Sequence, residues 1–146
     1  MVSIEHNKTS AARWLVGVFF MAALAAADQW AKARIARIFE NHAFAFSLPL
    51  PPWLMYLIYA GVLGYAAYYL IKNHQTLFWM QALAWGLILA GALENVIERL
   101  VLGYVRDFIY LTAGRFTGIY NLADFYILAG IALLLLPYKS GQNHQE

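Results

Sequence analysis

Four apolar segments, each about long enough to cross a bilayer as a helix, decide what this chain can fold into. The predicted spans are residues 14–32, 53–71, 77–97 and 119–136. Of all residues 62% are hydrophobic and 12% are charged, whereas a soluble domain is roughly half apolar and about a quarter charged. Inside lipid a backbone has to satisfy its own hydrogen bonds. The sequence therefore predicts an all-α membrane protein, one domain over residues 1–146, built as a four-transmembrane-helix bundle.

Residue types that are missing or scattered exclude several classes of site. The chain has no cysteine, which excludes disulfides, thiol nucleophiles and thiolate metal centres. Its four histidines lie far apart and show no spacing typical of metal ligands. The net charge is only +2 and no basic run is present, so nucleic acid is not an expected partner. We expect neither a metal nor an organic cofactor.

The first apolar segment has a second interpretation. Lys8 and Arg13 precede an apolar stretch over residues 14–24, and three alanines follow at residues 25–27. That order of basic, apolar and small residues is also typical of a secretory signal peptide. Cleavage after the alanines would leave three spans and would begin the mature chain at Asp28.

If the spans alternate in direction, the unusual polar residues meet at one face of the membrane. The end of the first span, the end of the third and the start of the fourth lie there. The polar residues at these positions are Asp28, Lys32, Glu94, Asn95, Glu98, Arg99, Asn121 and Asp124. The connector at residues 40–52 and the loop at residues 100–118 share this face, and small residues alternating with aromatic ones predict a short extended or β segment at residues 41–47. This one-sided gathering predicts a functional site.

Two pairs in that set, each spaced i,i+4, also have structural interpretations. Asp28 and Lys32 share a helical face, so they can form a simple interfacial ion pair. Asn95 and Arg99 share another face. There Arg99 can pair with an acid, or both side chains can simply reach for the membrane surface.

Two aspartates stand out because an ionised carboxylate in or beside apolar sequence is expensive. Asp124 lies a few residues into the fourth span, with Asn121 one turn earlier to donate a hydrogen bond. Asp107 lies in the preceding loop, where a surface ion pair with the adjacent Arg106 is the alternative interpretation. Aspartic-type hydrolysis uses two carboxylates at one place, because close acids cannot both ionise easily.

Five short motifs occur in order along the chain and resemble those of the lipoprotein signal peptidases (signal peptidase II), the membrane aspartic peptidases of bacteria. The matching segments are residues 28–32, 41–46, 94–99, 105–108 and 120–124. The fourth segment matches the family pattern Val-x-Asp-Phe in full, and the fifth matches Phe-Asn-x-Ala-Asp with Tyr120 in place of Phe. The resemblance covers roughly residues 14–136, so it favours a retained first span over a cleaved signal peptide.

The resemblance also implies roles for individual residues. Asp107 and Asp124 would be the catalytic pair, and Asp28 and Lys32 would support the site. The polar residues that it implies around the pair and the substrate are Asn41, Asn95, Arg99 and Asn121. It implies no metal and no cofactor.

The function that the resemblance implies is removal of signal peptides from lipid-modified prolipoproteins, with cleavage before a diacylglyceryl-cysteine. The expected partners are these prolipoproteins and membrane lipids, and the expected state is a monomer in the bacterial inner membrane. The resemblance implies cytoplasmic termini and a site on the periplasmic face. The basic residues point the other way, because six of the ten lie on the polar face and the positive-inside rule would place it in the cytoplasm.

Departures from the motifs leave other functions open. Glu94 replaces a Gly and Glu98 replaces an Asp, while Ala31 and Ala43 replace residues that the family keeps polar or flexible. The altered acids are compatible with a catalytically idle paralogue that binds lipidated peptides. A small proton-coupled transporter that uses Asp124 or Glu94 is a further alternative, although transporters bind near the midplane and these acids gather at one face.

Overall fold

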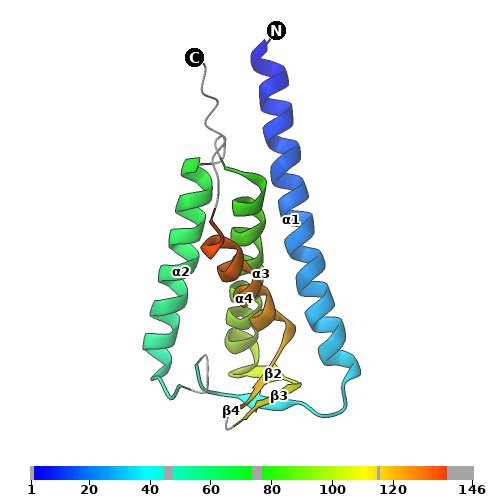
Figure 1. The fold of residues 1–146 in the computed structure, drawn as a ribbon, viewed down its shortest axis with the longest axis vertical. Helices are drawn as coiled ribbons and strands as arrows, with labels where there is room; N and C mark the ends of the chain where they lie inside the picture. Colours follow the sequence, from blue (N-terminus) through cyan, green and yellow to red (C-terminus); the bar gives the residue numbers. More distant parts are fainter. Residues whose placement is uncertain (1, 45–47, 74–76, 115, 138–146) are drawn as a thin grey trace.

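The computed structural model describes residues 2–44, 48–73, 77–114 and 116–137. Within them the chain forms four helices and four short strands. The helices are α1 (Val2–Arg34), α2 (Pro52–Asn73), α3 (Trp79–Leu102) and α4 (Leu122–Leu135). The strands are β1 (Phe39–Asn41), β2 (Val105–Asp107), β3 (Ile109–Ala113) and β4 (Phe116–Tyr120). Figure 1 shows α3 and α4 between α1 and α2, with the strands gathered at the end of the bundle far from the start of α1.

Three helices are long and apolar enough to cross a membrane. They are α1 from Leu15 to Arg34, α2 and α3. In α3, 39% of the span is buried inside the protein, against 11% for α1 and for α2. The third helix is therefore the core against which the others pack, and the mainly helical membrane fold is confirmed.

The fourth helix is shorter than predicted. It has 14 residues, about 21 Å at 1.5 Å per residue, whereas the hydrocarbon core is about 30 Å thick. The expected start at residue 119 is wrong, because residues 116–120 extend as β4 and pair with β3. Asn121 then caps the helix, which begins at Leu122. Apolar sequence that suits both a span and a strand conceals this boundary.

The helices α1 and α3 extend beyond their predicted ends. The first begins at Val2 and ends at Arg34, and the third continues to Leu102 instead of stopping near residue 97. As a result Glu98 and Arg99 lie within a helix rather than at its frayed end, and their side chains have fixed directions.

Two small antiparallel sheets lie beyond the helix ends. In the first, β1 pairs with β2, and Phe39 lies opposite Asp107 while Asn41 lies opposite Val105. The predicted extended segment is confirmed in part, since β1 ends at Asn41 and Phe44 forms an isolated bridge with Leu48. Residues 45–47 lie outside the described residues. The hairpin of β3 and β4 was expected only as loop.

Two glycines let α3 and α4 pack with their backbones almost touching. A Cβ atom added to Gly91 would lie 2.3 Å from the main-chain oxygen of Ala123, and one added to Gly130 would lie 2.5 Å from that of Ala84. Backbone atoms cannot rotate away as a side-chain end can. The contact at Ala123 fixes the first turn of α4, which carries Asp124, against α3.

We predict that Gly91→Ala lowers the free energy of unfolding by about 1–3 kcal/mol, the usual cost of overpacking a tight contact. Thermal unfolding in detergent micelles measures the change. Gly61→Ala is the matched control, because no atom lies within 4 Å of its added Cβ and it also lies inside a helix. Equal melting temperatures for the two variants would contradict the close packing of α3 on α4.

Candidate active site

Local sequence at the start of α4 positions Asp124. The Asn121 side chain caps the helix by accepting the Asp124 N–H through Oδ1 at 3.0 Å, and Asp124 Oδ2 accepts the Asn121 N–H at 3.2 Å. An acid in the first turn also interacts favourably with the helix dipole. The predicted hydrogen bond from Asn121 to Asp124 is therefore confirmed, with the Asn121 backbone as its donor.

Strand pairing positions Asp107. Asp107 is the last residue of β2, and it is only 1% exposed. The carboxylate accepts one hydrogen bond on each oxygen, from Asn41 Nδ2 at 2.8 Å and from Asn121 Nδ2 at 2.7 Å. One donor comes from β1 and the other from the cap of α4, so Asp107 is held from both sides.

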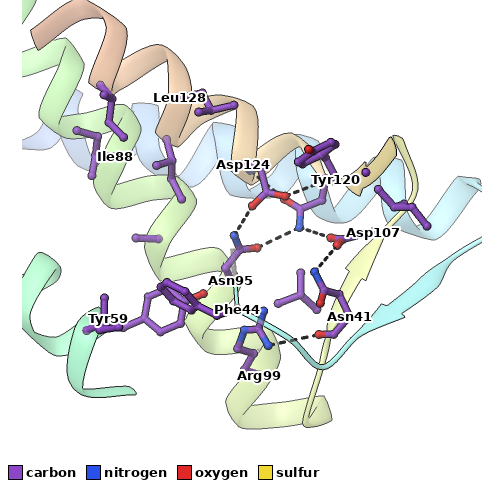
Figure 2. A pocket seen from close by; sticks show the side chains of 18 of the residues that line it. Asn41, Phe44, Tyr59, Ile88, Asn95, Arg99, Asp107, Tyr120, Asp124 and Leu128 are labelled. Atoms are coloured by element: carbon purple, nitrogen blue, oxygen red, sulfur yellow. Dashed lines mark hydrogen bonds between the residues drawn. The ribbon is translucent and has the colours of Figure 1, made fainter. Parts of the chain in front are cut away.

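The side chains of Asn95 and Asn121 connect the two acids. Asn95 Nδ2 donates to Asp124 Oδ1 at 2.9 Å, while Asn95 Oδ1 accepts from Asn121 Nδ2 at 3.1 Å. Since Asn121 also donates to Asp107, both carboxylates belong to one hydrogen-bonded network, which Figure 2 shows at the end of the cavity. The structure thus brings together Asp107, Asp124 and the three predicted asparagines.

Arg99 lies one helical turn beyond Asn95, and it forms no ion pair with any acid that the structure describes. Its guanidinium donates to the main-chain oxygens of Asn41 at 3.3 Å and Ala43 at 2.6 Å. The Ala43 N–H in turn donates to Asn41 Oδ1 at 2.9 Å. Arg99 therefore fixes the backbone that presents Asn41 to Asp107, and it also lines the cavity.

The acids open onto a cavity of about 540 Å³ with mainly apolar walls. Its polar end holds the network described above, and its apolar lining comes largely from α2, α3 and α4. Representative apolar side chains are Ile58, Val62, Ile88, Ile127, Leu128 and Ile131. In Figure 2 Ile88 and Leu128 lie along the helices away from the carboxylates. These wall residues carried no signal in the sequence, because apolar residues are common throughout the spans.

The electrostatics of Asp107 suit proton transfer near neutral pH. Burial raises the pKa of Asp107 to about 6, the hydrogen bond from Asn41 opposes that rise, and the nearby charge of Asp124 adds to it. A carboxyl group with a pKa in this range can give or take a proton near neutral pH, as acid–base catalysis requires.

Asp28 and Lys32 form the predicted i,i+4 ion pair, but the interfacial interpretation is wrong because both are buried. Lys32 Nζ lies 2.5 Å from Asp28 Oδ2 and 2.7 Å from Glu98 Oε2. Asp28 Oδ1 also accepts the Leu122 N–H, the first of α4, at 3.0 Å. The pair therefore lies behind the candidate site and ties α1 to the helix that carries Asp124.

Arg106 and Gln29 are polar residues whose roles the sequence did not indicate. The surface pair of Arg106 with Asp107 does not form, because Arg106 contacts Glu98 and Gln29 instead. Successive side chains of a strand point to opposite faces, so Arg106 points away from Asp107. Among the described residues, no group of three or more potential ligands is placed to hold a metal ion.

Comparison with known proteins gives consistent matches. A family model described as Signal peptidase (SPase) II matches residues 19–138. The lipoprotein signal peptidase of Streptococcus pyogenes serotype M1 is 42% identical over 98 residues, which are 66% of this chain and 63% of that protein. That of Streptococcus thermophilus strain CNRZ 1066 is 36% identical over 109 residues, 72% of this chain and 70% of that protein. The chain thus spans just under two thirds of the length of the first relative.

Two solved structures share the fold. Both are described as bacterial membrane enzymes determined by the in meso method, at 2.3 Å and 1.9 Å resolution. The first has a TM-score of 0.69 at 25% identity, covering 82% of this chain and 84% of that chain. The second has a TM-score of 0.66 at 26% identity, covering 82% and 89%.

The raised pKa of Asp107 predicts a pH-dependent stability. In the folded chain its pKa is about 6, against 3.8 as the ordinary value. The folded state therefore holds this proton more tightly, and the associated stability is lost as pH rises from about 3.8 through about 6. Asp107→Asn lacks this loss, so its melting temperature relative to the parent should rise with pH across that interval. A difference in melting temperature between parent and variant that stays constant from pH 4 to 7 would contradict the raised pKa of Asp107.

Proposed function

We propose, since the chain belongs to the signal peptidase II family, that it is a membrane aspartic endopeptidase. Its reaction is removal of signal peptides from lipid-modified prolipoproteins, by cleavage before a diacylglyceryl-cysteine. The observation that carries the proposal is the pair Asp107 and Asp124, joined through Asn121 at the polar end of an apolar cavity. The lipoprotein signal peptidase names of the streptococcal relatives support the same substrate class.

The proposed mechanism needs only the two carboxyl groups and water. The ionised carboxylate takes a proton from water as the water oxygen bonds to the scissile carbonyl carbon. The protonated carboxyl donates a hydrogen bond and then its proton to the carbonyl oxygen. When the tetrahedral intermediate collapses, the C–N bond breaks, the carboxyl that took the water proton gives it to the leaving nitrogen, and the other carboxylate takes a proton back from a hydroxyl of the intermediate. The two acids titrate together, so acid and base are roles of the pair rather than of one residue.

The remaining polar residues would orient the pair and the substrate. Asn95 and Asn121 already hold Asp124 and Asp107 by hydrogen bonds. Asn41 holds Asp107 from the other side, and Arg99 fixes the backbone around Asn41. Held in this way, the carboxyl groups lose little entropy when substrate binds. Asp28 and Lys32 support the start of α4 from behind.

The apolar cavity would accept the lipid part of the substrate. Its walls from α2 and α4 include Ile58, Val62, Leu128 and Ile131. Acyl chains gain about 0.8 kcal/mol for each methylene removed from water, and an apolar wall that ends at two acids presents the adjacent peptide bond to them. We propose that the enzyme acts as a monomer.

We further propose that the chain is a multi-pass protein of the bacterial cytoplasmic (inner) membrane with its strands and acids outside. The excess of basic residues on this face would place it in the cytoplasm by the positive-inside rule. The rule is a weaker guide here because several of these residues have roles in folding. Lys32 binds Asp28 and Glu98, Arg99 binds main-chain oxygens, and Arg106 binds Glu98. The positive-inside rule concerns basic residues that set the orientation of the protein during insertion. The presence of these three residues on this face is explained by the partners that they bind in the folded protein.

We predict that Asp107→Asn and Asp124→Asn each lower kcat for a lipidated prolipoprotein by about 10²–10⁴-fold, the usual contribution of general acid–base catalysis. Cleavage in a reconstituted detergent–lipid assay, followed by the size of the product, measures this. Glu40→Gln is the control, because that carboxylate lies on the neighbouring β1 and is exposed. Normal cleavage by both aspartate variants would refute the pair, and proton-coupled flux into liposomes without cleavage would support a transporter instead.

The absence of cysteine from the sequence permits a direct test of orientation. We predict that Thr112→Cys, in exposed β3, reacts with a membrane-impermeant maleimide in intact bacterial cells whose outer membrane is permeabilised. Lys72→Cys, exposed at the end of α2, should react only after the inner membrane is opened. The reverse pattern would place the acids in the cytoplasm.

A further inference from the structure

A polar cluster on the side of β2 away from the cavity has no part in the mechanism above. Its members are Gln29 on α1, Glu94 and Glu98 on α3, and Arg106 on β2. Building on the proposed peptidase function, we propose that this cluster is a positioning clamp for the strand that carries Asp107. Within the clamp, Gln29 acts as an adaptor, because its amide group hydrogen-bonds both Arg106 and the additional acid Glu94.

Glu98 holds both the main chain and the side chain of Arg106. Its Oε2 accepts the Arg106 backbone N–H at 3.0 Å, and its Oε1 accepts Arg106 Nε at 2.7 Å. Arg106 Nη2 also lies 2.6 Å from Glu98 Oε1. Charge-assisted bonds of this kind are stronger than neutral ones. The residue immediately before Asp107 is therefore anchored to α3 through two separate groups.

Gln29 extends this anchor to α1. Its Oε1 accepts Arg106 Nη2 at 2.6 Å, while its Nε2 donates to Glu94 and, at 3.3 Å, to Glu98 Oε1. The amide thus turns its acceptor to the cation and its donor to the two acids. A carboxylate at this position has no proton to donate, and a lysine has no acceptor, so only an amide satisfies all three neighbours.

Charge balance explains why Glu94 needs this partner. Asp28 and Glu98 are balanced by Lys32 and Arg106 through short ion pairs. Glu94 is a further acid, only 8% exposed, and its hydrogen-bond donor among the described residues is Gln29. A buried acid without a donor is costly. The change from Gly to Glu is therefore accommodated by Gln29 rather than by the catalytic pair.

The clamp has two consequences for Asp107. It draws the Arg106 guanidinium to the opposite side of β2, so no ion pair forms with the adjacent catalytic acid. It also fixes the strand between its neighbours, because β1 pairs with the other edge. Displacement of a reacting group by about 1 Å can cost about 100-fold in rate. A looser clamp should accordingly lower kcat more than it changes KM.

Steady-state kinetics with a lipidated prolipoprotein test the clamp through three variants. Arg106→Lys keeps the charge but loses the fork, and we expect kcat to fall by about 10-fold or more with KM within about twofold. Gln29→Glu sets a third carboxylate against Glu94 and Glu98, and a similar fall in kcat is expected. Gln29→Glu combined with Glu94→Gln returns the donor and the total charge, so kcat should recover to within about threefold of the parent.

A second measurement reads the strand directly and does not depend on cleavage. Hydrogen–deuterium exchange of residues 105–108 should be faster in Arg106→Lys and in Gln29→Glu than in the parent. It should slow again in the double variant Gln29→Glu with Glu94→Gln. Gln81→Glu is the matched control, because it makes the same chemical change near the opposite end of α3. It should alter neither kcat nor exchange.

The outcomes separate the two proposals. Unchanged kcat and unchanged exchange in both single variants would overturn the clamp while leaving the peptidase intact. If the double variant Gln29→Glu with Glu94→Gln had the same kcat and the same exchange rate as Gln29→Glu alone, the adaptor role of Gln29 would be overturned. A parent chain that cleaves no lipidated substrate would refute the proposed function, and exchange at residues 105–108 would still decide whether the clamp holds the strand.

Discussion

The buried amide of Asn121 is the interaction on which the rest of the site depends. Its nitrogen donates to Asp107 and to Asn95, while its oxygen accepts the Asp124 N–H and so begins α4. A single neutral group therefore joins the end of β2, the middle of the core helix and the start of the last helix. A charged side chain here would either repel the acids or neutralise one of them, whereas an amide brings them together and leaves both able to exchange protons.

The sequence predicted the membrane class, the three long helices and which polar residues gather at one end of the bundle better than it predicted their contacts. Asp107, Asp124 and Asn121 could be found because polar residues in apolar surroundings are costly and therefore conspicuous. The start of α4 and the β3–β4 hairpin could not, since apolar β-branched and aromatic residues fit a strand and a span equally well. The partners of Arg99 and Arg106 depended on which way each element faces, and spacing along the chain does not fix that across elements.

The two acids that depart from the family motifs belong to a separate polar system. Glu94 and Glu98 each precede by one residue a side chain that serves the cavity, Asn95 or Arg99. One residue turns a helix by about 100°, so the acids face α1 while their neighbours face the cavity. The body of α3 thus separates a balanced ion-pair cluster from the pair of carboxyl groups. Both systems nevertheless act on β2, one through Arg106 and the other through Asp107.

The close crossing of α3 and α4 positions Asp124 independently of many residues that shape the cavity. At Gly91 the nearest obstacle to a larger residue is a main-chain atom, since an added Cβ would lie 2.3 Å from the Ala123 oxygen. Wall residues such as Ile58, Val62 and Leu128 line the cavity away from that contact. Their size can therefore differ without moving the start of α4, which carries Asp124. The width of the cavity and the position of Asp124 thus depend on different contacts within one small bundle.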